Sequence, residues 1–366
     1  MVLPLSGIRV LDLTQNMCGP YCTQILGDLG AEIIKIEPPG GDILRRRGIR
    51  QGRNSLAFMQ FNRGKKSVEL DLEKPKQREI YRNLAKTADL VVEDMGPGAC
   101  DRLGIGYEIL RKEKPDLLYL SITGYGQEGK FKDYSPLDAV VQAVSGFMSI
   151  TGEEGGEFTK AGVPLADLFT GIYGAIGALS AIFYHENTGR GLRMDAAKLR
   201  VMLASIPDSV PKYLNTGGIT RAKGTKHHLA AILQALRTKD GAVICKASED
   251  REFGEFARAL GLGWMTEDPR FNGVNPRLAN VDELARLVEE KTRQLTTREF
   301  AGLLDSIGCA AGPINTLEQI LKDPYTAYHH LIMEVTDRAE GTFRVIGPPL
   351  SFDKFAWADT AFVPQP

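Results

Sequence analysis

The segment IRVLDLTQNMCGPYCTQILGDLGAEIIKIEPP, residues 8–39, decides the fold class of this chain. It opens with a short apolar run rich in β-formers, which is typical of a strand buried on both faces. Gly19 and Pro20 then break the chain ahead of an amphipathic helix, and Gly30 stands where that helix ends. A second apolar strand follows at residues 33–37. The order strand, helix, strand predicts the opening of a nucleotide-binding α/β domain.

The loop between the first strand and the helix, TQNMCGP, argues against a dinucleotide. A dinucleotide site needs G-x-G-x-x-G at this place, so that the backbone can approach the pyrophosphate. Glu37 does stand at the end of the second strand, where an acid would bind a ribose hydroxyl. Without the glycine-rich turn we do not expect NAD, and the departure favours a different adenine-bearing ligand.

Strands and helices continue to alternate after this opening. The predicted strands are residues 66–72, 90–93 and 117–123, and the predicted helices are residues 75–88 and 99–103. In the helix at 75–88 we expect Ile80, Leu84 and Ala85 to face inward. Residues 137–214 are predicted to be mainly helical. The alternation predicts an α/β fold, in which a parallel sheet has helices on both faces.

The composition changes near Asn215, where NTGGITRAKGTKHH is typical of a linker or mobile loop. The residues that follow predict a smaller α/β domain, with a strand at 241–247 and helices at 249–260, 281–294 and 297–307. A short helix at 316–322 comes next, and then two strands within 331–355, around the turn Glu340–Gly341. We therefore expect a large Rossmann-like domain at 1–214, a linker and small domain at 215–315, and a C-terminal segment at 316–366.

Composition narrows the class of partner and the compartment. The 366 residues carry a formal net charge of −1, which is not the basic surplus that holds nucleic acid or an anionic membrane. The first residues show no positive region followed by an apolar core, so we expect no signal peptide. Five scattered cysteines suit free thiols in a reducing cytoplasm. We expect no metal site, because Cys18 and Cys22 have no second ligand pair.

Residues 165–184 are almost all apolar and are long enough to span a bilayer. They include Asp167 near the start, and Gly171, Gly174 and Gly177 at a spacing that lets a helix approach its neighbours closely. No similar segment accompanies them. The pattern therefore favours a buried core helix over a membrane span.

Several blocks spread over nearly the whole chain resemble family III CoA transferases. These blocks are PLSGIRVLDLTQNMCGPYCTQILGDLGAEIIKIEPPGGD, FNRGKKSVELDL, VVEDMGPGACDRLGIGYE, LLYLSITGYGQEG, YSPLDAVVQAVSGFMSITG, PLADLFTGIYGAIGALSAIFYH and GPPLSF. The family includes formyl-CoA transferase, carnitine CoA-transferase and α-methylacyl-CoA racemase. The resemblance implies coenzyme A as part of the substrate and a C-terminal return to the large domain. It also implies a homodimer in which two chains interlock as linked rings.

Asp167, in PLADLFTG, is the candidate catalytic residue. Taken alone it is typical of a helix N-cap, where a carboxylate accepts backbone N–H bonds. The resemblance places it at the position of the transferase nucleophile, and a carboxylate held at a helix N-terminus stays oriented for attack. It would attack an acyl-CoA to give a mixed anhydride, which CoA thiolate converts into an aspartyl-CoA thioester. A second carboxylic acid would then reverse these steps and leave as its CoA ester.

Two other functions stay open at this stage. A 2-methylacyl-CoA racemase or epimerase of the same family needs a His before the glycine turn, and Leu137 stands at that place. Asp138 matches a carboxylate found in both branches, or is a helix N-terminal acid. The non-enzymatic alternative is a CoA-binding subunit of a heteromeric transferase.

The resemblance also assigns CoA contacts. Leu70 and Met95 match apolar positions beside adenine, and Arg102 matches an arginine near the phosphates. Asn16 lies in the first loop, whose backbone approaches CoA in the family. Arg45, Arg46 and Arg47, and in the linker Lys223, Lys226, His227 and His228, are further candidates to hold or screen the phosphates.

Four positions depart from formyl-CoA transferase. Met17 replaces Gln, Pro38 replaces Arg, Asp94 replaces Asn and Leu137 replaces Tyr. Met17 cannot donate a hydrogen bond to an oxyanion as an amide does, and Asp94 places an acid near an anionic ligand. These losses suggest an acceptor acid less polar than oxalate, but they identify neither donor nor acceptor.

Overall fold

The computed structural model of the chain describes residues 2–353 and 360–365. It divides into two compact units. The first consists of Met1–Met148, Lys160–Ile219 and Thr326–Pro366, and the second of Ser149–Thr159 and Thr220–Tyr325. The chain thus leaves the first unit twice, and Ser149–Thr159 is an excursion that the linear division at residues 214 and 315 does not include.

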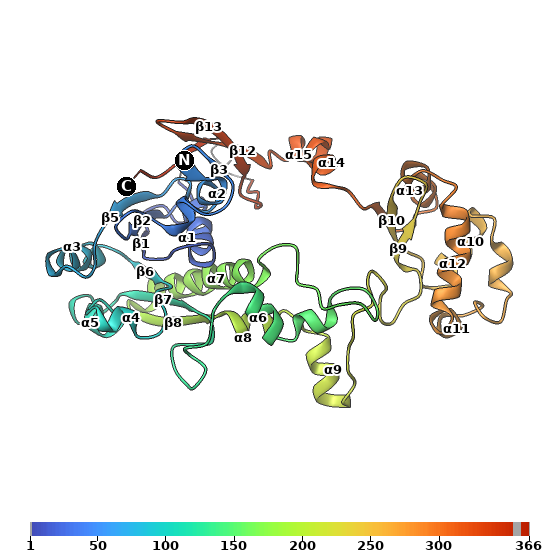
Figure 1. The fold of residues 1–366 in the computed structure, drawn as a ribbon, viewed down its shortest axis with the longest axis horizontal. Coiled ribbons are helices and arrows are strands. Elements are labelled where there is room, and N and C mark those ends of the chain that lie inside the picture. Colours follow the sequence, from blue (N-terminus) through green and yellow to red (C-terminus); the bar gives the residue numbers. More distant parts are fainter. Residues whose placement is uncertain (1, 354–359, 366) are drawn as a thin grey trace. The chain divides into compact units, whose positions relative to one another are not determined.

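Six parallel strands form the main sheet of the first unit, in the order β5-β2-β1-β6-β7-β8 (Figure 1). Their bounds are β1 Arg9–Asp12, β2 Glu32–Glu37, β5 Lys66–Glu69, β6 Leu90–Glu93, β7 Leu118–Thr123 and β8 Leu192–Ala197. The predicted α/β fold with a parallel sheet is confirmed. The order is that of a doubly wound sheet, whose winding direction reverses between β1 and β6.

Helices cover both faces of this sheet, because successive strand residues point to opposite sides. The helices of this part are α1 Cys18–Asp28, α2 Leu56–Asn62, α3 Pro75–Lys86, α4 Ala99–Arg102, α5 Tyr107–Glu113, α6 Asp138–Val144, α7 Leu165–Thr188, α8 Lys198–Ala204 and α9 Ser209–Thr216. Val10 and Leu120 belong to one apolar cluster with α1 and α7. Leu11 and Tyr119, their neighbours in sequence, belong to the other with α3 and α5.

Two local details of the first unit differ from the sequence predictions. Residues 137–214 are mainly helical, as predicted, but they also contain β8, which was not predicted because LRMDAA carries Arg193 and Asp195 and lacks the apolar run of an inner strand. As the edge strand it pairs with β7 alone and tolerates polar residues. In α3 the predicted inward position of Ala85 is confirmed and Leu84 packs against the same cluster, whereas Ile80 is 48% exposed and Tyr81 is buried instead.

α7 is long and apolar enough to cross a membrane by length and composition alone. Its small residues, however, face α1. A Cβ at Gly171 would lie 2.9 Å from the carbonyl oxygen of Cys18, and one at Gly174 would lie 3.1 Å from the sulfur of Cys22. Glycine at these positions therefore lets the two helices pack closely, and this face of α7 is part of the core, as predicted.

The end of the chain adds a second sheet to the first unit, in the order β13-β12-β14. Its strands are β12 Ile332–Asp337, β13 Gly341–Ile346 and β14 Thr360–Phe362. Val335 and Phe343 pack with Phe58 and Met59 of α2. The predicted strand pair around Glu340–Gly341 is confirmed, while Phe355, its predicted end, lies outside the described residues.

The second unit is a smaller α/β body with an antiparallel sheet, in the order β11-β10-β9. Its elements are β9 Leu233–Arg237, β10 Ala242–Lys246, β11 Ala311–Pro313, α10 Asp250–Ala259, α11 Val274–Ala279, α12 Val281–Thr292 and α13 Thr297–Ser306. Phe253, Phe256 and Phe300 are completely buried between the helices and the sheet. The shorter elements α14 Leu317–Lys322 and α15 Pro324–Tyr328 follow in the chain.

Candidate active site

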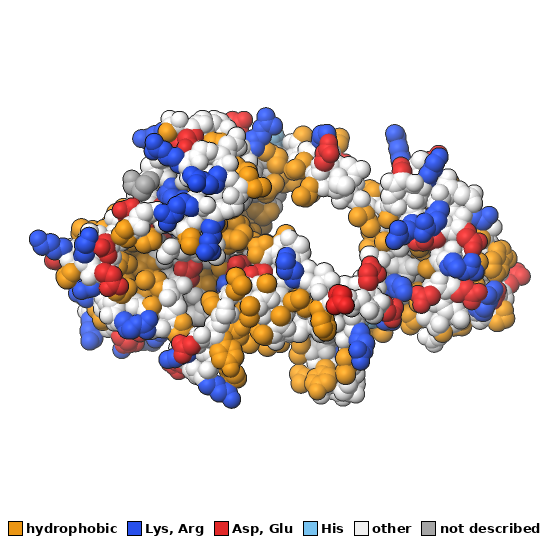
Figure 2. Space-filling model, viewed as in Figure 1, with side chains coloured by type: hydrophobic (Ala, Val, Ile, Leu, Met, Phe, Trp, Pro, Cys, Tyr) orange, Lys and Arg blue, Asp and Glu red, His pale blue; other side chains and the backbone are white. Residues whose placement is uncertain are grey.

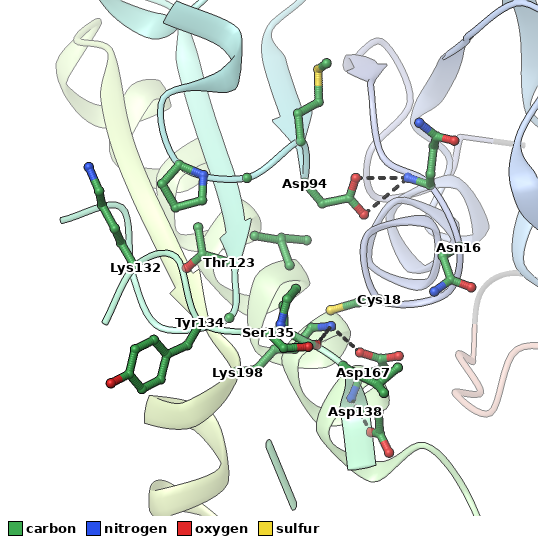
Figure 3. A pocket seen from close by; sticks show the side chains of 18 of the residues that line it. Asn16, Cys18, Asp94, Thr123, Lys132, Tyr134, Ser135, Asp138, Asp167 and Lys198 are labelled. Carbon is green, nitrogen blue, oxygen red and sulfur yellow. Dashed lines mark hydrogen bonds and ion pairs between the residues drawn. The ribbon is translucent and has the colours of Figure 1, made fainter. Parts of the chain in front are cut away.

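A cavity of about 700 Å³ opens beyond the carboxyl ends of β1, β6 and β7 (Figure 3). Its wall includes Gln15, Asn16, Cys18, Asp94, Met95, Thr123, Lys132, Tyr134, Pro136, Leu137, Asp138, Asp167 and Lys198. Ligands of doubly wound sheets bind where the winding reverses, and here this point lies between β1 and β6. The fold thus directs attention to this cavity before any chemistry is considered.

Asp167 lies in the wall of the cavity, in the first turn of α7. The N-cap of α7 is Pro164, so the interpretation of Asp167 as the capping residue is wrong. The carboxylate is nevertheless close to the positive end of the helix dipole. Its side chain is only 8% exposed, and burial raises its pKa against the opposing effect of Lys198.

Lys198, the first residue of α8, approaches Asp167 from the end of β8. Its ammonium nitrogen lies 2.5 Å from Oδ1 of Asp167 and donates to the carbonyl oxygen of Pro136 at 2.9 Å. The side chain is 12% exposed. Burial alone would lower the pKa of Lys198, but the Asp167 carboxylate more than offsets this and the pKa is raised. The two groups form a charged pair at the cavity wall.

Asp138 holds the backbone beneath Asp167. One carboxylate oxygen accepts the N–H of Asp167 at 3.1 Å, and the other accepts Nε2 of Gln142 at 2.6 Å. The side-chain oxygen of Gln142 in turn accepts the N–H of Ala161, in the segment before α7. Asp138 is therefore a positioning residue for the turn that carries Asp167, and it also lines the cavity.

The loops after β1 and β6 are joined across the sheet. The Asp94 carboxylate accepts the backbone N–H of Gln15, with its two oxygens at 3.0 and 3.2 Å. Burial raises the pKa of Asp94 well above its usual range. Asn16 adopts a left-handed φ of 65°, which Asn tolerates better than most residues, and its N–H donates to Asp42. Asn16 and Asp94 thus shape the crevice, and both line it.

Comparison with known proteins identifies the family of this fold and site. The model of CoA-transferase family III matches residues 5–365. The chain belongs to CoA-transferase family III. The transferase is 34% identical over 360 residues to succinyl-CoA:glutarate CoA-transferase of Homo sapiens, an alignment that covers 98% of this chain and 82% of the relative. It is 36% identical to succinate–glutarate CoA-transferase of Agrobacterium fabrum, over 88% of this chain and 82% of that one.

A solved structure agrees with the assignment. The crystal structure of a CaiB/BaiF family protein from Brucella suis superposes with a TM-score of 0.91 at 33% identity, covering 100% of this chain and 97% of that one. The chain is therefore an enzyme that transfers CoA, as the resemblance implied. The described wall of the cavity holds no histidine, and Leu137, 62% exposed, stands where a racemase has one.

Three predicted CoA contacts of the transferase do not line the cavity. Met17 packs with the apolar cluster around Phe58, and Leu70 is 6% exposed in the core below the sheet. Arg102 is exposed at the end of α4, where its guanidinium lies 3.5 Å from the carbonyl oxygen of Pro97. Met95 and Leu137, in contrast, lie in the wall and offer it apolar surface.

Two of the predicted basic groups, Arg45 and Lys226, have carboxylate partners of their own. The Arg45 guanidinium bonds both oxygens of Glu37 at 2.7 and 2.6 Å and stacks over Phe58, with 3.9 Å to the ring centroid. Glu37 and Arg45 are thus each other's partners, and neither side chain lines the cavity. In the second unit, Lys226 pairs with Glu154 at 3.3 Å and with Asp282 at 2.6 Å.

Lys198 is the main site residue that the sequence did not reveal. The reason is that the strand ending at Ala197 was not predicted within the mainly helical stretch 137–214, so no strand end was expected there to carry a functional side chain. The sequence did contain one indication of a functional side chain here. Lys198 is a cation flanked by the apolar residues Ala197 and Leu199. Lys132 and Tyr134, in the exposed loop before α6, were also missed and line the cavity.

Proposed function

We propose that Asp167 is the covalent nucleophile of this transferase. The observation that carries the proposal is the position of its carboxylate, buried in the cavity wall at the first turn of α7 and paired with Lys198 at 2.5 Å. Asp138 holds the backbone of this turn through the Asp167 N–H. An oriented carboxylate in a water-poor site is suited to covalent catalysis.

The reaction then consists of four acyl transfers. The Asp167 carboxylate attacks the thioester carbonyl of the donor and displaces CoA thiolate, which leaves a mixed anhydride. The thiolate attacks the Asp167 carbonyl carbon, which forms the aspartyl-CoA thioester and releases the donor acid as a carboxylate. The acceptor carboxylate attacks this thioester and displaces CoA thiolate again. Attack of the thiolate on the acceptor carbonyl yields the new CoA ester and restores Asp167.

We further propose that both acids are dicarboxylates of four or five carbons, with succinyl-CoA as the donor. Relatives at 31–34% identity are named as CoA-transferases of succinyl-CoA with glutarate, mesaconate or D-citramalate, and one at 36% is named succinate–glutarate CoA-transferase. A dicarboxylate offers a second carboxylate beside the reacting one. Lys132, in the exposed loop of the cavity wall, provides a cation for it.

The covalent step is tested by mass spectrometry of the Asp167 peptide after incubation with succinyl-CoA. We expect a CoA-sized adduct in the natural protein, and its loss together with at least a 10³-fold drop in kcat in Asp167→Asn. Asp133→Asn, which changes an exposed acid of the same cavity wall, is the control. An adduct that persists in Asp167→Asn would contradict the proposal.

A panel of acceptors separates the dicarboxylate proposal from the prediction of a less polar acid. Leu137 supports the second view, because it is a large apolar side chain exposed at the cavity. We expect glutarate to give a higher kcat/KM than butyrate or valerate. Preference for the monocarboxylates would leave the transferase mechanism intact and overturn the dicarboxylate proposal.

We also propose a homodimer in the cytoplasm. α7 has a second apolar face opposite its core face, where Tyr173, Ile176 and Phe183 are 46%, 51% and 73% exposed. Figure 2 shows further apolar side chains over α9, whose Tyr213 and Leu214 are 60% and 74% exposed. Exposed apolar side chains gathered on a helix face are typical of an interface. Sedimentation of the natural protein and of Phe183→Glu tests the dimer, and cell fractionation tests the compartment.

A further inference from the structure

Lys198 has an environment that suits a change of partner during the reaction. The groups whose charges act on it come from three parts of the fold: Asp167 of α7, Cys18 of α1 and Asp94 after β6. Tyr125, after β7, lies close enough for Lys198 to oppose the rise that burial causes in the Tyr125 pKa. Burial raises the pKa of the Cys18 thiol and of the Asp94 carboxyl well above their usual ranges, which favours their neutral forms. Asp167 is therefore the main counter-ion of the Lys198 ammonium.

The covalent reaction removes this counter-ion. In the mixed anhydride and in the aspartyl-CoA thioester, Asp167 is acylated and carries no charge. Lys198 then keeps a carbonyl contact with Pro136, at 2.9 Å, but has lost the anion beside its nitrogen. An ammonium that is 12% exposed regains little hydration in exchange, so the acylated site attracts an anion.

We propose that Lys198 binds the reacting carboxylate of the free acid while Asp167 is acylated. This inference rests on the proposed covalent function and goes beyond it by assigning the acid-binding residue. The donor acid is released as a carboxylate beside Lys198, and the acceptor carboxylate takes its place. When the acceptor attacks the aspartyl thioester it loses its charge, and Lys198 pairs with Asp167 again once the new CoA ester has formed.

The arrangement also explains why one site handles two chemically similar acids in turn. Before acylation the Asp167 carboxylate is paired with Lys198, so the reacting carboxylate of a free acid finds no unpaired cation at this position and does not block the acyl-CoA. After acylation the site is vacated. The free acid therefore binds in a fixed order, after the covalent step, and beside Asp167.

The test separates the two halves of the reaction in Lys198→Met and Lys198→Arg. Asp167-peptide adducts formed from succinyl-CoA are measured by rapid quench and mass spectrometry, and the adducts are then chased with increasing glutarate. We expect Lys198→Met to form the adduct and to need at least ten times more glutarate for half-maximal chase. Lys198→Arg keeps the charge and should recover a large part of this loss. Lys212→Met, which removes an exposed lysine of α9, is the control.

The outcomes distinguish this proposal from failure of the covalent mechanism. Absence of any adduct in the natural protein would contradict the covalent mechanism at Asp167 itself. An adduct in Lys198→Met that is chased at unchanged glutarate concentration would overturn the acid-binding role and leave Lys198 as a structural partner.

A second measurement uses only the natural protein, so its result does not depend on whether a variant folds. In the natural protein, the chase at subsaturating glutarate should slow as pH rises, because the acylated enzyme holds Lys198 without its carboxylate and burial lowers the pKa of such an ammonium. The acylation step should not show this alkaline decline. A chase rate that stays constant up to pH 10 would contradict the proposal.

Discussion

Two buried lysine–carboxylate pairs in the same unit behave in opposite ways. Under the sheet, Lys65 contacts Asp12 at 3.0 Å, and at the cavity Lys198 contacts Asp167 at 2.5 Å. Burial by itself would raise the pKa of both carboxyls. At Asp12 this effect is outweighed by the cations of Lys65 and Lys35 and by two threonine hydroxyls, which lower the pKa to about 2. At Asp167 the effect of burial is the larger one, and the pKa is raised.

The difference lies in the number of partners. Four oxygens lie within 3.0 Å of the Lys65 ammonium nitrogen and share its three N–H donors: those of Asp12, the Pro20 carbonyl, Thr23 and Asn62. Asp12 accepts three more hydrogen bonds from Thr14 and Thr23. Among the described residues, Lys198 is the one recorded partner of the Asp167 side chain. A fully bonded pair stabilises the fold, and a sparsely bonded pair beside a cavity is free to react.

Removing the cation of the fully bonded pair should have the largest effect on stability. Lys65→Met leaves Asp12 buried without its nearest counter-ion, and we expect a loss of about 3–5 kcal/mol in the free energy of unfolding. Hydrogen exchange of peptides from β1 and β5 under increasing urea measures this locally. Lys66→Met removes the neighbouring lysine, whose side chain is 70% exposed, and should change it by less than about 0.5 kcal/mol. Equal effects of the two substitutions would contradict the claim that the buried Lys65–Asp12 pair stabilises the fold.

At the cavity pair we expect smaller single effects and clear coupling. Lys198→Met and Asp167→Asn each leave one buried group without its partner, at a cost of about 1–3 kcal/mol. The double variant is uncharged at both positions and should be more stable than the sum of the single losses by at least about 1 kcal/mol. Urea denaturation of the natural protein, the two single variants and the double variant gives this coupling energy. If the losses of the two single variants simply add in the double variant, the pair contributes nothing to the free energy of unfolding.

The raised pKa of Asp167, unlike the lowered pKa of Asp12, should appear in the pH dependence of acylation. Asp167 must be ionised to attack, and burial raises its pKa above the ordinary value of 3.8. The rate of adduct formation should therefore fall as pH falls through this raised pKa. In Lys198→Met the fall should begin at a higher pH, since the ammonium lowers the pKa of Asp167. Rapid-quench rates between pH 4 and 8 measure both curves, and coincident curves would show that Lys198 does not act on the carboxylate.

The same contrast explains what could be predicted from the sequence. Apolar runs such as those of β1 and β6 revealed the parallel sheet, because buried strands are governed by local composition. The reversal between β1 and β6 then places the cavity at the loops that carry Asn16 and Asp94. Asp167 was predicted through the resemblance, and it does lie in the wall.

Contacts between distant segments could not be predicted. Lys198 meets Asp167 because β8 joins the edge of the sheet beside β7, and this pairing has no local signature in a strand that contains Arg193 and Asp195. Arg45 and Glu37 are eight residues apart and each suggested a ligand, yet they satisfy one another. Sequence patterns indicate which residues are charged, but tertiary structure determines which charges are already neutralised.

The smallest effect is expected at Met17, and it tests how far family comparison determines chemistry. Formyl-CoA transferase has Gln at this position, so Met17→Gln would restore the amide if that residue acted on an oxyanion. In this chain the Met17 side chain packs with the apolar cluster around Phe58 and Tyr21 and does not line the cavity. We therefore expect Met17→Gln to change kcat less than about threefold and to lower the free energy of unfolding by about 1 kcal/mol, because the partly buried side chain would place an amide against an apolar cluster. Met17→Leu keeps the packing and should be close to neutral in both measurements. A tenfold rise in kcat for the glutamine variant would instead show that this loop turns toward the substrate during turnover, and that the resting pair of Asp167 and Lys198 is not the whole catalytic arrangement.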